Sequence, residues 1–140
     1  MINIIEKENL QQKQLDFIIK SLSESKQVSR VDDVKYRILK VYVIIKNKKI
    51  IAFTCNKTSL IKRFDAEVGY TWVDPKFRGN IYGVKLLNFQ IQDIKNKNIK
   101  AYSVNDKTNN IMVKYCVKNK FKVFATTRYN NKNLQWRVVN

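Results

Sequence analysis

The segment spanning residues 65–96 constrains the fold of this chain more than any other. Residues 65–73 have the alternation of a β-strand, and Pro75 ends this strand because proline cannot donate a ladder hydrogen bond. A loop with two glycines follows, and residues 82–96 then carry apolar side chains at helical spacing. This order directs free backbone N–H groups and the positive end of a helix at one spot, which suits a pyrophosphate group. The pattern alone also fits an ordinary strand–turn–helix connection.

The strand predicted over residues 65–73 has two faces, because successive side chains of a strand point to opposite sides. One face is expected to carry Ala66, Val68, Tyr70 and Trp72. The other is expected to carry Glu67, Gly69, Thr71 and Val73.

The remaining elements follow from the same two periodicities. Strands are predicted over residues 2–6, 36–45, 49–55, 99–104, 121–128 and 134–139. Helices are predicted over residues 8–24 and from Asn109, whose side chain can cap the helix, to about residue 118. Residues 25–34 fit either a loop or a short helix. The order predicts a single α/β domain over residues 1–140, with a mixed sheet flanked by helices.

The positive charge of the chain is uneven. The net charge is +17, of which residues 76–140 supply +12, with 14 basic and only 2 acidic side chains. Such a field favours polyanions, either nucleic acid or a phosphorylated cofactor. The alternative is a compositional bias, because Lys, Asn and Ile are abundant together, as AT-rich genomes encode. Both interpretations stay open at this point.

Several classes of protein are excluded or disfavoured. No apolar run approaches the roughly 20 residues of a transmembrane helix, and acidic residues near the N-terminus do not fit a signal peptide. Cys55 and Cys116 lie far apart and the chain has no histidine, so we expect no metal site. A reducing cytoplasmic location is the simplest context for these two cysteines.

The segment from Val73 to Leu87 resembles the acetyl-CoA loop of the GNAT acyltransferase superfamily. That loop reads Arg/Gln-x-x-Gly-x-Gly/Ala after a strand that ends in Val-x-Pro. The matching residues here are Val73, Pro75, Arg78, Gly79 and Gly83. Ile81 stands where the family has its central glycine, and its side chain is expected to narrow the phosphate site.

A second motif of the same family follows in the expected order. The family has an Asn at the start of a later helix and a Gly-Phe pair after it, and Asn109 and Phe121 match these positions. The predicted order of strands and helices also matches over nearly the whole chain. The resemblance therefore implies a GNAT-like mixed sheet.

The resemblance implies an acetyl-CoA-dependent N-acyltransferase in which an amine attacks the thioester directly. The backbone N–H at Val73 would polarise the thioester carbonyl. The coenzyme would lie against the loop residues and the later helix. These positions are Val73, Arg78, Gly79, Asn80, Ile81, Tyr82, Gly83 and Asn109.

Glu67 is the candidate general base. It lies eleven residues before Arg78, the spacing of the catalytic glutamate in the histone acetyltransferase branch of the family. A carboxylate that points into a cleft would have a raised pKa. The alternative is a solvated glutamate on a strand.

Tyr115 and Cys116 are the candidate general acids. The family tyrosine aligns with Cys116, and Tyr115 lies one position earlier, about 100° around the helix. Each residue also fits a buried core position.

The acceptor amine has no signature in the sequence. A nucleic acid, or a molecule bound to it, is one class of acceptor that the charge favours. The alternatives are a non-catalytic GNAT-fold module that binds nucleic acid and a DNA-modifying acyltransferase of the phage type. Small size and the Lys/Asn/Ile bias suit a phage or mobile element, and the chain is expected to be a monomer or a homodimer.

Overall fold

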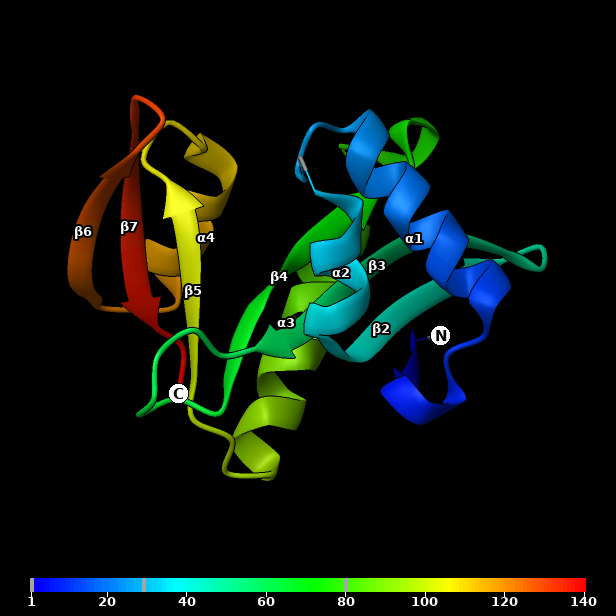
Figure 1. Cartoon of the computed structure of the whole chain (residues 1–140), viewed down its shortest axis with the longest axis horizontal. Helices are drawn as coiled ribbons and strands as arrows, with labels where there is room; N and C mark the ends of the chain where they lie inside the picture. The colour runs from blue at the N-terminus through cyan, green and yellow to red at the C-terminus, as the bar shows by residue number, and fades with distance from the viewer. Residues whose placement is uncertain (1, 29, 80) are drawn as a thin grey trace.

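One mixed sheet organises the chain (Figure 1), as the computed structural model shows for residues 2–28, 30–79 and 81–140. Within these residues seven strands run in the spatial order β1-β2-β3-β4-β5-β7-β6. Only β4 and β5 pair in parallel. The strands are β1 (Ile2–Glu6), β2 (Ile38–Lys46), β3 (Lys49–Thr58), β4 (Ala66–Val73), β5 (Ala101–Asp106), β6 (Val123–Tyr129) and β7 (Lys132–Val138). This is the α/β architecture that the sequence predicts.

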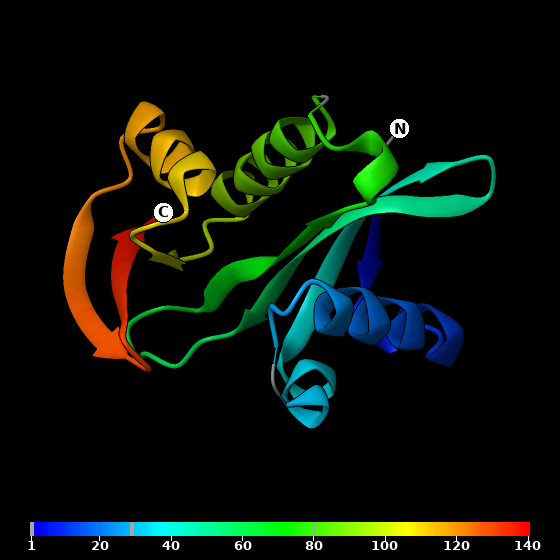
Figure 2. The ribbon, with the colours of Figure 1, turned by 90° about the horizontal axis from the view of Figure 1, so that it is seen from above.

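Helices cover both faces of the sheet (Figure 2). One face carries α1 (Gln12–Glu24) and α2 (Val31–Arg37), and the other carries α3 (Tyr82–Asn96) and α4 (Asn110–Lys118). Two short 3-10 helices, η1 (Lys7–Asn9) and η2 (Pro75–Phe77), lead into α1 and α3. The sequence of residues 25–34 fits either a loop or a short helix. In the structure α2 begins at Val31 and ends where β2 begins, so the strand predicted from residue 36 begins two residues later.

Each helix layer has its own apolar core. On the α1 side, Leu15, Ile18 and Leu22 pack with Val41 and Phe53 of the sheet. On the other side, apolar residues of α3 and α4 pack on β4 and β5, and they include Leu87, Ile91, Ile94, Tyr115 and Val68. The sheet therefore separates the apolar core on the α1 side from the apolar core on the α3 side.

The sheet opens between β4 and β5. The two strands pair over only three positions, Ala66 with Ala101, Glu67 with Tyr102 and Val68 with Ser103. Beyond Val68 they diverge, so that they are close at their starts and far apart at their ends (Figure 1). Backbone groups on one edge of the later part of β4 therefore face a gap instead of a neighbouring strand.

A β-bulge interrupts β4 at the start of this gap. Gly69 pairs with Cys55 and Trp72 with Phe53, so β4 has one more residue than β3 between the two pairs. Tyr70 lies in the extra stretch with a φ of 56°. A bulge of this kind re-aims the side chains that follow it.

Because of the bulge, the prediction that Val68 and Trp72 share one face of the strand is wrong. Before it, Glu67 contacts Arg37 of α2 and Val68 packs toward α3. After it, Trp72 packs on Phe17 of α1, so residues 68 and 72 lie on opposite faces. Strict alternation placed them together, because one inserted residue reverses a period of two.

Candidate active site

Two cavities adjoin β4, and the larger of them lies between the end of β4, the first two turns of α3 and one side of α4. It has a volume of about 890 Å³, and the loop residues Arg78, Gly79 and Gly83 contribute to its wall. Most of the wall is apolar, with Val73, Phe77, Val84, Leu87, Ile111 and Met112 among its residues. A cavity with apolar walls and a few polar groups is typical of a small-molecule or cofactor site.

The second cavity is polar and lies on the side of β4 that faces the loop after α1 and the β6–β7 hairpin. Its volume is about 470 Å³, and Lys57, Glu67, Ser103 and Asn105 are among the residues that line it. Both cavities are lined by Gln27, Thr71, Asn109 and Met112. The two cavities therefore meet at the gap between β4 and β5.

Two side chains cover the carbonyl groups at the open edge of β4. Gln27 Nε2 donates to the Thr71 carbonyl at 2.9 Å, and Arg78 Nε donates to the Val73 carbonyl at 2.9 Å. The N–H of Asp74 donates to Ile51 of β3 at 2.7 Å. Because neighbouring N–H groups of a strand point to opposite edges, the N–H of Val73 points toward the gap. An oxyanion at the gap would find this donor.

The loop before α3 is built differently from the expected phosphate site. Gly79 has a φ of 82°, a left-handed conformation that favours glycine. Ile81 is 63% exposed and lines neither cavity, so its side chain does not narrow the larger one. Tyr82 packs edge-on against Phe77, with ring centroids 5.8 Å apart. Asn80 lies outside the described residues.

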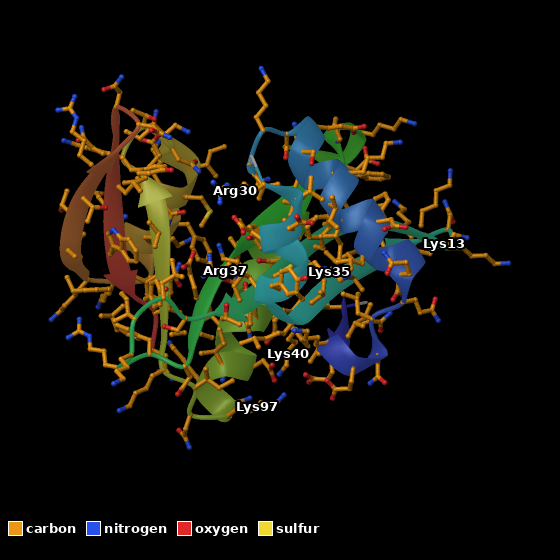
Figure 3. All side chains as sticks on the ribbon, viewed as in Figure 1. Lys13, Arg30, Lys35, Arg37, Lys40 and Lys97 are labelled. Atoms are coloured by element: carbon orange, nitrogen blue, oxygen red, sulfur yellow. The ribbon has the colours of Figure 1, made fainter. Side chains whose placement is uncertain are left out.

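The Glu67 carboxylate lies where β4 and β5 are still paired. Its Oε2 lies 2.7 Å from Lys57 Nζ, and its Oε1 accepts hydrogen bonds from Arg37 at 3.0 Å and Tyr102 at 2.9 Å. Figure 3 shows Arg37 at the side of α2 nearest to β4. Glu67 is 5% exposed, so the alternative of a solvated glutamate is wrong.

The expected raised pKa of Glu67 is also wrong. Burial by itself raises the pKa of this carboxyl group, but the charges and hydrogen bonds of Lys57 and Arg37 outweigh burial and lower it. The carboxylate is therefore ionised at neutral pH. A low pKa also makes it a weaker proton acceptor than the sequence predicts.

Lys57 is a site residue that sequence reasoning missed. It is 7% exposed, and burial lowers the pKa of its ammonium group although Glu67 opposes this. A Cβ atom at Gly69 would lie 2.8 Å from Lys57 Cε, so the glycine leaves room for this side chain. Phe53, Cys55 and Lys57 share a face of β3. A lysine at the end of this otherwise apolar face was the feature of the sequence that could have identified it as a site residue.

The two candidate acids lie in different environments. Tyr115 lines the larger cavity, and its hydroxyl donates to Asn88 Oδ1 at 2.7 Å. Burial raises the pKa of Tyr115 to about 12. Cys116 is 1% exposed, packs in the α3–α4 core and has a pKa raised by burial. The geometry brings Tyr115 to a cavity and leaves Cys116 in the core.

Asn109 performs the capping role that the sequence predicts. Its side chain accepts a hydrogen bond from the Met112 N–H at 3.3 Å at the start of α4. In addition it lines both cavities.

No group of three or more His, Cys, Asp or Glu side chains within residues 2–28, 30–79 and 81–140 could hold a metal ion. No helix in the same residues is long and apolar enough to cross a membrane.

Replacing Glu67 by Gln should lower the free energy of unfolding by about 3 kcal/mol at neutral pH, because the buried Lys57 and the half-buried Arg37 lose their counter-charge. The pKa of Glu67 is lowered in the folded protein. Its contribution is therefore complete above the ordinary value of 4.5 and is lost as the pH falls through the lower folded value. Urea unfolding at a series of pH values measures the difference from wild type. Glu24→Gln at the exposed end of α1 is the control, and a difference that persists unchanged in acid would contradict the prediction.

Known proteins match this chain in structure but not in sequence. No protein-family model and no curated protein sequence matches this chain. Solved structures do match. An acyl-CoA N-acyltransferase from Pseudomonas aeruginosa has a TM-score of 0.79 and 10% identity, covering 99% of this chain and 97% of that chain.

Two further structures cover the chain equally well. An acetyltransferase of the GNAT family from Staphylococcus aureus has a TM-score of 0.69 and 18% identity, covering 100% of both chains. Arabidopsis thaliana NAA60, in complex with a bisubstrate analogue, has a TM-score of 0.73 and 11% identity, covering 99% of this chain and 97% of that chain. At such identities the likeness shows the fold alone. The chain has the GNAT fold, as its two motifs predict.

Proposed function

We propose that this chain is an acyl-CoA-dependent N-acyltransferase. The observation that carries the proposal is the meeting of an apolar cavity and a polar cavity at the gap between β4 and β5. The larger cavity, with Arg78, Gly79 and Gly83 at its wall, would hold acetyl-CoA. The polar cavity would hold the acceptor amine. Structural neighbours described as an acyl-CoA N-acyltransferase and as an acetyltransferase support this assignment.

The chemistry needs an oxyanion donor and two proton transfers. The N–H of Val73 points toward the gap and is our proposed donor to the thioester carbonyl as it gains negative charge. Glu67 remains the proposed base, now paired with Lys57 in the acceptor cavity. Tyr115 is the proposed acid, because it lines the larger cavity and its hydroxyl bonds Asn88, which also lines that cavity, whereas Cys116 lines neither cavity.

Acetyl-CoA should bind the wild-type protein, and Val84→Glu should weaken binding by about tenfold or more, because a carboxylate at the cavity wall repels the phosphates. Val84 is half exposed, so the substitution leaves the core intact. Isothermal titration calorimetry measures both proteins. Gln92→Glu adds the same charge on the exposed side of α3, outside both cavities, and serves as the control. A wild-type protein that gives no heat and no thermal shift with saturating acetyl-CoA would rule the proposal out.

Glu67→Gln should reduce the rate of acyl transfer by about 10²-fold, at the low end of the usual range for a general base because the pKa of Glu67 is low. The dissociation constant of acetyl-CoA should barely change, since Glu67 lines only the acceptor cavity. Single-turnover transfer, measured under conditions in which circular dichroism shows both proteins folded, gives the comparison. An unchanged rate would remove Glu67 from the role of base.

A second candidate function, binding of nucleic acid, rests on unpaired basic side chains of the second half. Among the described residues, the only ion pairs that involve residues 76–140 are those of Asp93 with Lys40 and Lys97. Exposed cations of this half without an ion pair are Lys76, Arg78, Lys85, Lys95, Lys100, Lys107, Lys114, Lys118, Lys120, Lys122, Arg128 and Lys132. Arg137 is 4% exposed, so it does not belong to this surface.

Wild-type protein should shift duplex DNA in gels at about 50 mM salt and release it at about 200 mM, because phosphate contacts release counterions. Lys120→Glu with Lys122→Glu should weaken the shift by about tenfold. The matched control is Lys13→Glu with Lys20→Glu on the exposed face of α1, away from β6 and β7 (Figure 3 labels Lys13). No shift at the lower salt would remove nucleic acid from the proposal and leave the acyltransferase assignment intact.

A further inference from the structure

A row of buried polar side chains crosses the sheet beneath α3. Tyr42, Thr54 and Gln90 are fully buried at 0% exposure and Asn56 is 3% exposed. Buried polar groups cost free energy unless they are hydrogen-bonded, and here each side chain bonds the next. The row begins at Asp93 near the end of α3 and ends at Thr71, which lines both cavities.

The direction of the first two hydrogen bonds follows from Asp93. Burial raises the pKa of this carboxyl group, but Tyr42, Lys97 and Lys40 outweigh burial and lower it, so the group is an ionised acceptor. The Tyr42 hydroxyl therefore donates to Asp93 Oδ2, at 2.6 Å. With its only hydrogen used, the Tyr42 oxygen accepts from Asn56 Nδ2 at 3.1 Å.

The next three hydrogen bonds continue in the same direction. Gln90 Nε2 donates to Asn56 Oδ1 at 2.8 Å and to the Cys55 carbonyl at 2.9 Å. Gln90 Oε1 therefore accepts, and the Thr54 hydroxyl donates to it at 3.1 Å. Thr54 and Thr71 hydroxyls lie 2.8 Å apart, and since the Thr54 hydrogen is used, Thr71 is the donor.

This direction leaves the Thr71 hydroxyl with acceptor capacity only. Its hydrogen points at Thr54, and only its oxygen lone pairs are available to a ligand where the cavities meet. A thioester carbonyl and a thioester sulfur are also acceptors, so neither can bind Thr71 in this state. An attacking amine carries N–H groups and is a donor.

We propose that the Thr71 oxygen accepts a hydrogen bond from the attacking amine and so orients the amine lone pair toward the thioester. This inference rests on the proposed acyltransferase function. The amine nitrogen forms the bond to the acyl carbon, the carbon–sulfur bond breaks, and the proton lost by nitrogen ends on the coenzyme thiol. Thr71 neither gains nor loses a proton. Thr54 and Gln90 are positioning residues, because they act only through Thr71.

The anchor of the row is an ion cluster of Asp93 with the buried Lys40 and the exposed Lys97. Asp93 lies 3.3 Å from Lys40 Nζ and 2.9 Å from Lys97 Nζ. Figure 3 shows Lys40 and Lys97 together at the end of α3, on the side of the molecule opposite the divergent ends of β4 and β5. These cations keep Asp93 ionised, and its charge fixes the direction of every hydrogen bond as far as Thr71.

The test uses hydroxylamine as the probe acceptor, because it is small and mostly unprotonated at neutral pH, and acetohydroxamate is the measured product. Thr71→Val should lower kcat about tenfold, the cost of one hydrogen bond in the transition state. The KM for acetyl-CoA should stay unchanged, and Thr71→Ser should restore most of the rate. Thr54→Val should lower kcat about threefold, because Thr71 is then free to turn its hydrogen toward the ligand.

Thr126→Val on the exposed part of β6 is the control and should behave as wild type. Equal kcat for wild type and Thr71→Val would overturn the inference, as would a Thr71→Ser protein as slow as the valine variant. Calorimetry with acetyl-CoA distinguishes this from failure of the proposed function. If wild type neither binds acetyl-CoA nor accelerates acetohydroxamate formation, the proposed function falls and this inference falls with it.

Discussion

The structure depends on the buried ionic contacts of Glu67, because four elements meet there. Lys57 comes from β3, Tyr102 from β5 and Arg37 from α2, and all three bind the Glu67 carboxylate of β4. One residue later the pairing of β4 with β5 ends. The charge cluster therefore holds the sheet together at the base of the gap. Without that fixed base the two strands would have no defined point at which to separate, and the two cavities no defined place to meet.

The sequence allowed most of the fold to be predicted, because its helices and strands obey simple periodicities. The stripe of Leu15, Ile18 and Leu22 and the cap at Asn109 both appear in the structure as expected. The β-bulge was not predicted, because Gly69 is its only sign in the sequence, and a glycine in a strand has several explanations. The short helix α2 has too few residues for a periodic pattern to identify it.

The sequence singled out candidate site residues but not their electrostatics. The resemblance assigned Arg78, Gly79 and Gly83 to the coenzyme and Glu67 to the general base, and these roles stay predictions. The structure places the first three residues at the wall of one cavity and Glu67 at the wall of the other. The pKa of Glu67 depends on Lys57 and Arg37, which lie 10 and 30 residues away in sequence. Such partners are visible only once the chain is folded. The role of Gln90 was likewise not predictable, because it is a single polar residue within the apolar stripe of α3.

The bulge at Tyr70 divides β4 into two parts whose odd and even positions exchange roles. An alignment that carried one alternation through the whole strand would compare residues of opposite faces after Gly69. Deleting Tyr70 would remove the extra residue and restore the alternation of a regular strand. The ring of Trp72 would still face Phe17 and the Thr71 hydroxyl would still face Thr54, because both already lie on the faces that a strand without the extra residue gives them. For protein engineering, the bulge can therefore be taken out without exchanging the faces of the strand.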